Sequence, residues 1–160
     1  MKIVTGKRRS GKLFLLSIFF KNRLIEKETQ KEDFVEVALD RKSNIKYRNL
    51  NLLYYHIMEY TRDIDKKFYV LIDEIQLLYK VKNKDVNGSL VPEEDRKMLY
   101  TTFYDILNDL MVHPNLDVYV TRSNSKMLSK DIVTIFCDRG SEIKVYPLSF
   151  ADMRLTLWLT

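Results

Sequence analysis

The first fourteen residues, MKIVTGKRRSGKLF, constrain the fold more than any other part of the chain. Lys2 to Thr5 are typical of a short buried strand, and this segment ends at Gly6. From Gly11 to about Asn22 the sequence predicts a helix that is apolar nearly all round, as expected of a helix packed onto a sheet inside a domain. A strand that passes through a glycine-bounded loop into a helix is the opening of an α/β unit.

The rest of the chain continues this alternation of strands and helices. Five consecutive apolar residues before Asp73 predict a strand that is buried on both faces, as in a parallel sheet. Pro92, followed by three acidic residues, is a favourable helix start, and His113-Pro114 ends that helix. Further strands are predicted at Asp33–Ala38, Leu116–Thr121 and Glu142–Tyr146, further helices around Leu50–Tyr60 and over Ser129–Phe136, and a loop from Val81 to Val91. The pattern predicts an α/β fold with helices on both faces of the sheet.

Composition sets the broad class of protein. The chain has 160 residues, which corresponds to one domain, and a net charge of +5 that permits contact with a polyanion without demanding it. The Lys80–Lys84 stretch is interpreted as solvated surface. Cys137 is the only cysteine, so no intrachain disulfide forms, which suits a reducing cytoplasm. The apolar run Leu13–Phe20 is too short to cross a bilayer and is interpreted as a buried helix.

Gly6, Gly11 and Lys12 satisfy the spacing of a phosphate-binding loop. In such a loop the backbone N–H groups and the helix N-terminus face the phosphates, and the lysine reaches the outer ones. Here the loop would be completed by Arg8, Arg9 and Ser10. Leu13 occupies the position at which a serine or threonine hydroxyl normally binds Mg²⁺. The alternative is an ordinary basic loop between a strand and a helix.

Asp73 and Glu74 form an acidic pair at the carboxyl end of the most apolar strand. This is where an α/β sheet places catalytic groups, and in ATPases of this kind the first carboxylate holds Mg²⁺ while the second polarises the attacking water. After the next strand, Asn124 is the first choice, and Thr121 the second, for a side chain that reaches between the γ-phosphate and the acids. Arg139 is a candidate arginine finger toward a neighbouring subunit. Solvated acids and a surface arginine are the alternatives.

Four segments in order resemble a family of prokaryotic AAA+ ATPases, from Ile3 to about Asp152. They are Gly6-Lys-Arg-Arg-Ser-Gly-Lys12, Leu71-Ile-Asp-Glu-Ile-Gln76, Val118-Tyr-Val-Thr-Arg-Ser-Asn-Ser-Lys-Met-Leu-Ser129 and Val145-Tyr-Pro-Leu-Ser-Phe150. The resemblance implies a P-loop NTPase fold, with a five-stranded parallel sheet of order 5-1-4-3-2. It also implies ATP and Mg²⁺ as ligands, with Lys12 on the phosphates, Asp73 on the metal and Glu74 as the water-polarising base.

Three departures from the family's pattern bear on function. Leu13 replaces the hydroxyl residue, and Arg122 replaces a glycine, where it would either clash with the γ-phosphate or supply a cation in place of the metal's charge. Family members also continue past the Pro-Leu-Ser-Phe segment into a helical lid and a further domain. We therefore expect residues 1–152 to form the ATPase core alone, followed by a tail at 153–160 that does not resemble the family's continuation.

The leading hypothesis is an ATP-binding AAA+ core with weak or absent ATPase activity. Leu13 leaves the loop backbone and Lys12 unchanged but removes an oxygen ligand from Mg²⁺, so hydrolysis is expected to suffer more than binding. One alternative is a non-catalytic module that binds a protein partner or associates with itself. Another is a nucleic-acid-associated ATPase, which the basic balance permits, although no basic helix with interleaved aromatics is evident and most of the ten tyrosines fall where core or strand is predicted.

Overall fold

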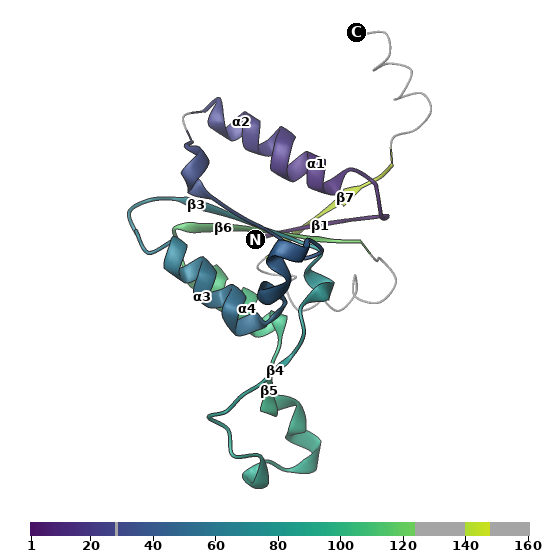
Figure 1. Ribbon diagram of the computed structural model, residues 1–160, viewed down its shortest axis with the longest axis vertical. Coiled ribbons are helices and arrows are strands. Elements are labelled where there is room, and N and C mark those ends of the chain that lie inside the picture. Colours follow the sequence, from purple (N-terminus) through teal and green to yellow (C-terminus); the bar gives the residue numbers. More distant parts are fainter. Residues whose placement is uncertain (28, 124–139, 148–160) are drawn as a thin grey trace.

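The computed structural model describes residues 1–27, 29–123 and 140–147, and its centre is a five-stranded parallel sheet (Figure 1). The strand order is β2-β3-β6-β1-β7, and every neighbouring pair is parallel. Numbered along the chain within this sheet, that order is 5-1-4-3-2, so the predicted topology is confirmed. The strands are β1 Lys2–Gly6, β2 Phe34–Ala38, β3 Phe68–Asp73, β6 Leu116–Arg122 and β7 Ser141–Val145.

Helices cover both faces of the sheet, as predicted (Figure 1). One face carries a continuous helical segment that begins at Lys12 and ends at Ile25, with a π-helical stretch at its centre. The opposite face carries α3 and α4. The helices are α1 Lys12–Phe14, the π-helix η1 Leu15–Phe20, α2 Lys21–Ile25, α3 Leu50–Tyr60 and α4 Phe103–Val112, with short 3-10 helices at η2 Lys31–Asp33, η3 Lys42–Arg48, η4 Ile75–Leu77, η5 Gly88–Leu90 and η6 Glu93–Leu99.

Alternating side chains of the strands divide the core between the two faces. Toward α3 and α4 lies the larger cluster, which includes Leu53, Ile57, Leu107 and Leu110, each at most 1% exposed. Toward the helical segment lies a smaller cluster made by Val4, Leu16, Phe34, Leu71 and Tyr119. Because successive strand residues point to opposite faces, the odd-numbered residues of β3 and β6 face the helical segment and the even-numbered ones face α3 and α4.

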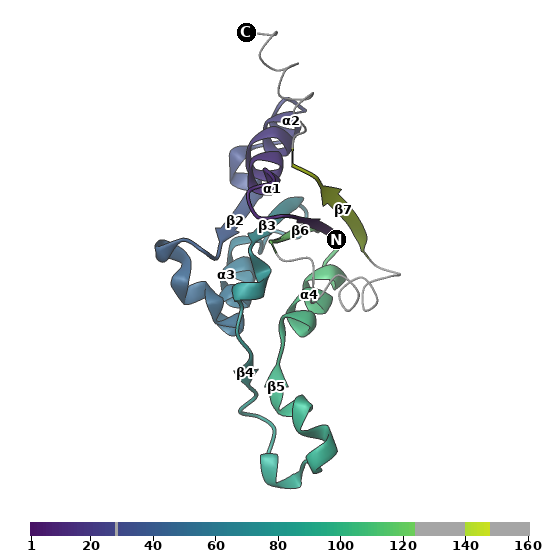
Figure 2. The same cartoon turned by 90° about the vertical axis from the view of Figure 1, so that its right-hand side faces the viewer.

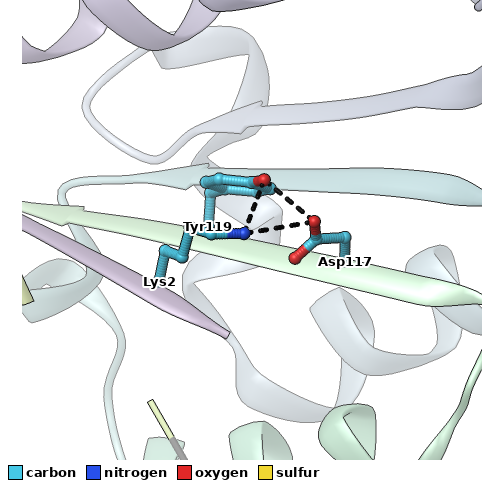
Figure 3. Close-up of polar contacts among 3 residues, drawn as sticks. All are labelled: Lys2, Asp117 and Tyr119. Carbon is cyan, nitrogen blue, oxygen red and sulfur yellow. Dashed lines mark hydrogen bonds and ion pairs between the residues drawn. The ribbon is translucent and has the colours of Figure 1, made fainter. Parts of the chain in front are cut away.

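A polar cluster ties β1 to β6 at the amino-terminal end of the sheet (Figure 3). The Lys2 Nζ donates to the Tyr119 hydroxyl at 3.0 Å and to the Asp117 carboxylate at 3.4 Å, and the Tyr119 hydroxyl donates to the same carboxylate at 2.9 Å. Burial, with help from Asp117, raises the pKa of Tyr119, so the phenol keeps the proton that it donates. Each of the three groups therefore has a partner.

The interpretation of Leu13–Phe20 as a buried helix is wrong. Leu16 is 4% exposed and packs on the sheet, but Phe14 and Phe19 are 61% and 63% exposed. A helix packed on a sheet buries only one stripe of its surface, and no element among the described residues covers the opposite stripe here. Within the described residues, no helix has the length and apolar character needed to cross a membrane.

The prediction of one helix from Pro92 to His113 is also wrong. This part of the chain forms η6, then β5 Tyr100–Thr101, and then α4, which begins at Phe103. The β5 strand pairs antiparallel with β4 Val81–Lys82 inside the predicted loop, and residues 81–101 project from the domain as an arm (Figure 2). A capping box starts α4, because the Asp105 carboxylate accepts from the Thr102 N–H at 2.7 Å. The predicted helix over Ser129–Phe136 lies outside the described residues.

Candidate functional site

The candidate site lies where β1, β3 and β6 end side by side. These strands are neighbours in the sheet, and their carboxyl ends carry Gly6, Asp73 and Thr121. In open α/β sheets, ligands bind in the crevice outside the carboxyl ends of the strands. The fold therefore brings together the glycine loop, the acidic pair and the polar turn, which the sequence separates by more than a hundred residues.

The loop between β1 and α1 has the backbone shape that a nest of N–H groups requires. Arg9 and Gly11 both adopt left-handed conformations, with φ of 65° and 83°. The Ser10 N–H donates to the Lys7 carbonyl at 3.2 Å, which closes the turn. The Ser10 hydroxyl is buried and makes no hydrogen bond within the described residues. A buried, unpaired hydroxyl inside such a loop is available to a bound anion.

Gly6 is required by close packing against the edge strand. A Cβ at this position would lie 2.2 Å from the Val145 carbonyl oxygen on β7 and 2.8 Å from the Ser10 hydroxyl. We expect Gly6→Ala to destabilise the domain by about 1–3 kcal/mol, because the β1–β7 pairing must open to admit the methyl group. Urea unfolding measures this effect. The matched control is Gly88→Ala, whose Cβ would meet only Leu99 side-chain atoms at 3.6 Å, and equal destabilisation by both substitutions would contradict the prediction.

Lys12 points back into the loop from the first turn of the helix. Its ammonium group donates to the carbonyls of Gly6 at 3.1 Å and Lys7 at 2.9 Å, and the residue is only 5% exposed. No carboxylate forms an ion pair with it among the described residues. The loop thus surrounds a buried cation that is held only by neutral carbonyls, and an anion of matching shape would compensate that charge.

Asp73 is fixed by the neighbouring strand. The Thr121 hydroxyl, at the end of β6, donates to the Asp73 carboxylate and accepts from the Glu74 N–H at 3.1 Å. Burial raises the pKa of Asp73, and Glu74 and Asp40 act in the same direction, while the Thr121 hydrogen bond and Lys12 oppose them. Thr121 therefore positions both acidic residues from one hydroxyl group.

Glu74 is held by two residues that sequence reasoning did not select. Its carboxylate accepts from the Ser123 hydroxyl at one oxygen and from the Gln76 amide at the other. The Glu74 backbone is left-handed, with a φ of 58°, which turns the side chain away from the line of β3. A cavity of about 500 Å³ in front of it is lined by Arg8, Asp40, Glu74, Gln76, Leu77 and Ser123.

Arg122 lies on the sheet face opposite to Asp73. It is 7% exposed, follows the even-numbered residues of β6 toward α4, and interacts electrostatically with Tyr104 on that helix. Burial lowers the pKa of this arginine. Arg122 was expected either to clash with the γ-phosphate or to replace the metal's charge, and its placement on this face supports neither role. Asn124 and Arg139, the other predicted site residues, lie outside the described residues.

Comparison with known proteins identifies the family. A sequence family described as AAA domain matches residues 1–154. The chain belongs to this family. An uncharacterized protein of Haemophilus influenzae is 29% identical over an alignment of 163 positions, which covers 95% of this chain and 32% of the relative. The chain thus spans about a third of the length of that relative.

The structure of PCH-2 from C. elegans has the same fold as this AAA domain. It superimposes with a TM-score of 0.54 at 18% sequence identity, covering 89% of this chain and 34% of PCH-2. The family and the fold together make the chain an AAA-type domain of the P-loop NTPase class, whose members bind ATP.

The residues of this AAA domain fit a nucleotide better than they fit a metal ion. The loop offers an unpaired Ser10 hydroxyl and the Lys12 cation, which suit phosphate oxygens. The described residues contain no group of three or more potential side-chain ligands for a metal. Mg²⁺ in such sites is held by one or two carboxylates together with substrate phosphates, so Asp73 beside a bound triphosphate meets the minimum requirement.

Leu13 borders the Asp73 side of the site in this AAA domain. Its side chain lines a cavity of about 80 Å³ together with Ser17, Asp73 and Thr121. Such a volume accommodates water molecules, and the carboxylate and hydroxyl groups give them partners. Leu13 itself offers an alkyl surface where an oxygen would be expected. If a metal ion bound beside Asp73, position 13 would give it no side-chain oxygen, and water would have to supply that ligand.

Proposed function

We propose that this domain binds ATP in the Gly6–Lys12 loop and hydrolyses it slowly. The observation that carries the proposal is that the same end of the sheet holds a buried lysine after β1, with no acidic partner among the described residues, and two positioned carboxylates after β3, with β6 between the two strands. Those are the groups that phosphoryl transfer to water requires: a cation for the phosphates, a metal ligand and a base. The position of the loop, at the start of a helix, adds the favourable field of that helix N-terminus.

Each residue has one proposed role. Lys12, Arg8, Arg9, Ser10 and the two loop glycines bind the phosphates, and Asp73 binds Mg²⁺, which neutralises charge on the transferring phosphoryl group when it is bound. Glu74 accepts a proton from the attacking water, and Ser123 and Gln76 hold its carboxylate in place for that purpose. Asn124 and Arg139 remain proposed contacts to the γ-phosphate and to a neighbouring subunit.

A nucleotide titration tests the proposal. We expect a fluorescent ATP analogue to bind to the full chain in the absence of Mg²⁺, and Mg²⁺ to strengthen binding by less than about 10-fold because Leu13 offers it no oxygen. Fluorescence anisotropy in EDTA and then in Mg²⁺ measures both affinities. Absence of binding in either condition would contradict the proposal and favour the alternative, a non-catalytic module that binds a protein partner.

A further inference from the structure

Two basic segments that are far apart in the sequence lie side by side next to the candidate site. Residues 41–49 contain four basic and no acidic residues, and residues 79–84 contain three basic and no acidic residues. Asn49 and Tyr79 form a parallel β-bridge, and the Tyr79 N–H donates to the Arg48 carbonyl at 3.1 Å. This pairing joins the η3 region to the start of the arm. The exposed cations of the two segments, named here the basic surface, are Arg41, Lys42, Lys46, Lys80, Lys82 and Lys84.

The cations of the basic surface are not held in ion pairs. None of its six cations forms an ion pair with an acidic side chain in the part of the chain that the structure describes. Elsewhere, by contrast, the Lys66 ammonium lies 2.7 Å from the Asp33 carboxylate. Arg48 is excluded from the surface because its guanidinium donates to the Leu39 carbonyl at 2.9 Å. A run of unpaired cations on one surface attracts a polyanion.

Exposed aromatic side chains lie among these cations. Tyr100 is 44% exposed and stands directly opposite Lys82 in the β4–β5 pair, so the two side chains share one face of the arm. Tyr79, at the junction of the two segments, is 52% exposed. Most of the ten tyrosines were expected in core or strand, but five of them have exposed side chains, including Tyr100, which lies in β5. A position in a strand therefore does not argue against a nucleic-acid surface.

We propose that the basic surface binds single-stranded nucleic acid. Lys80 and Lys82 lie roughly 6–7 Å apart in an extended stretch, and Lys84 follows in the next turn, so these exposed lysines can contact successive phosphates of a backbone. Tyrosines placed between cations offer faces on which unpaired bases stack, and a duplex does not present such bases. The arm (Figure 2) carries part of this surface clear of the domain, where a flexible strand can reach it.

The proposed surface adjoins the nucleotide site, and binding to it does not depend on ATP hydrolysis. It is nevertheless close to that site along the chain, since only η4 and the short segment that follows it separate Glu74 from Lys80. Arg41 also lines the cavity that contains Leu13 and Asp73. A strand bound along the basic surface would therefore pass beside the acidic pair.

The first test removes three charges from the surface. A fluorescently labelled thymidine oligonucleotide of about 20 nucleotides is titrated with the full chain at several salt concentrations. Wild-type protein is expected to bind, and the triple variant Lys80→Gln, Lys82→Gln, Lys84→Gln to bind on the order of 10-fold more weakly. Because each phosphate contact contributes roughly 0.7 to the slope of log K against log salt, that slope should fall in magnitude by about 2.

The matched control is the triple variant Lys27→Gln, Lys31→Gln, Lys67→Gln. These exposed lysines lie near the amino-terminal ends of β2 and β3, whereas both basic segments follow the carboxyl ends of these strands, and their loss gives the same net charge. The control should keep wild-type affinity. Equal weakening by both triples would overturn the proposal, because net charge alone would then explain binding. Thermal unfolding of all variants establishes that each is folded.

A second variant tests the aromatic contact. Tyr100→Ala is expected to weaken oligonucleotide binding about 5-fold or more, whereas Tyr55→Ala on α3, which removes a tyrosine that is 66% exposed, should not change it.

Three results would overturn the proposal: no binding of the oligonucleotide at low salt, equally tight binding of a duplex of the same length, or displacement by polyglutamate as effective as by unlabelled oligonucleotide. The last would indicate an acidic protein partner.

Discussion

Replacement of Lys12 with alanine is expected to weaken ATP binding on the order of 100-fold, or about 2.7 kcal/mol. The Lys12 ammonium is buried inside the loop, where it donates to the Gly6 and Lys7 carbonyls and has no acidic partner among the described residues. A triphosphate in the loop would exchange those neutral acceptors for charged ones, and hydrogen bonds between charged groups each contribute about 1.5–3 kcal/mol. Anisotropy of a fluorescent ATP analogue in EDTA measures the loss without any effect of the metal.

Lys7→Ala is the matched control for Lys12→Ala. Lys7 lies in the same loop, but its side chain is exposed and only its backbone carbonyl contacts Lys12. We expect its loss to change affinity by no more than about 3-fold, since an exposed charge is screened by water and salt. If Lys12→Ala retained wild-type affinity while remaining folded by thermal unfolding, ATP would not bind in this loop, and the proposed function would fail.

The strands were predictable because their signals are local. The apolar run before Asp73 and the alternating residues of Phe34–Ala38 identify strands without knowledge of the partners. The order of the strands came instead from the resemblance to AAA+ ATPases, since periodicity does not say which strands are neighbours. Both the strands and their order are confirmed within the described residues.

The two wrong predictions about the fold both concern features that depend on tertiary contacts. The apolar stripe from Leu99 to Leu110 matches a helical period, but pairing of β5 with β4 overrides it at Tyr100 and Thr101. A signal against the long helix was present, because Thr102 and Asp105 have the spacing of a capping box. The exposure of Phe14 and Phe19 had no such signal, because composition does not show which stripe of an apolar helix meets the sheet.

The site was predictable where a motif fixes the chemistry, and not where backbone shape decides it. The spacing of Gly6, Gly11 and Lys12 selected the loop, and the structure brings this loop next to Asp73 and Glu74. Ser123 and Gln76 contact Glu74 because that residue has left-handed backbone, which is uncommon for a glutamate and is not indicated by the sequence. Their role stays a prediction, as do those of the other site residues.

Leu13→Thr is expected to raise the rate of Mg²⁺-dependent ATP hydrolysis on the order of 10-fold, which corresponds to about 1.4 kcal/mol of the barrier. Leu13 lines the cavity that also contains the Asp73 carboxylate and the Thr121 hydroxyl, so a hydroxyl at position 13 would face the same space. An added oxygen there supplies a ligand that Mg²⁺ prefers in place of an alkyl group. Affinity for ATP in EDTA should not change, because the loop backbone and Lys12 are unaltered.

Leu13→Val distinguishes the effect of the added hydroxyl oxygen from the effect of a smaller side chain at position 13. Valine and threonine have nearly the same shape, and both are smaller than leucine, so they differ at this position chiefly in a methyl group against a hydroxyl. Steady-state release of phosphate, measured against Mg²⁺ concentration, should rise for the threonine variant and stay at the wild-type level for the valine variant. An equal rise in both would show that Leu13 limits the site by its bulk, with water supplying the missing ligand once there is room. No change in either would show that position 13 does not govern the metal at all, and the cause of the proposed slow hydrolysis would then have to lie elsewhere in the site.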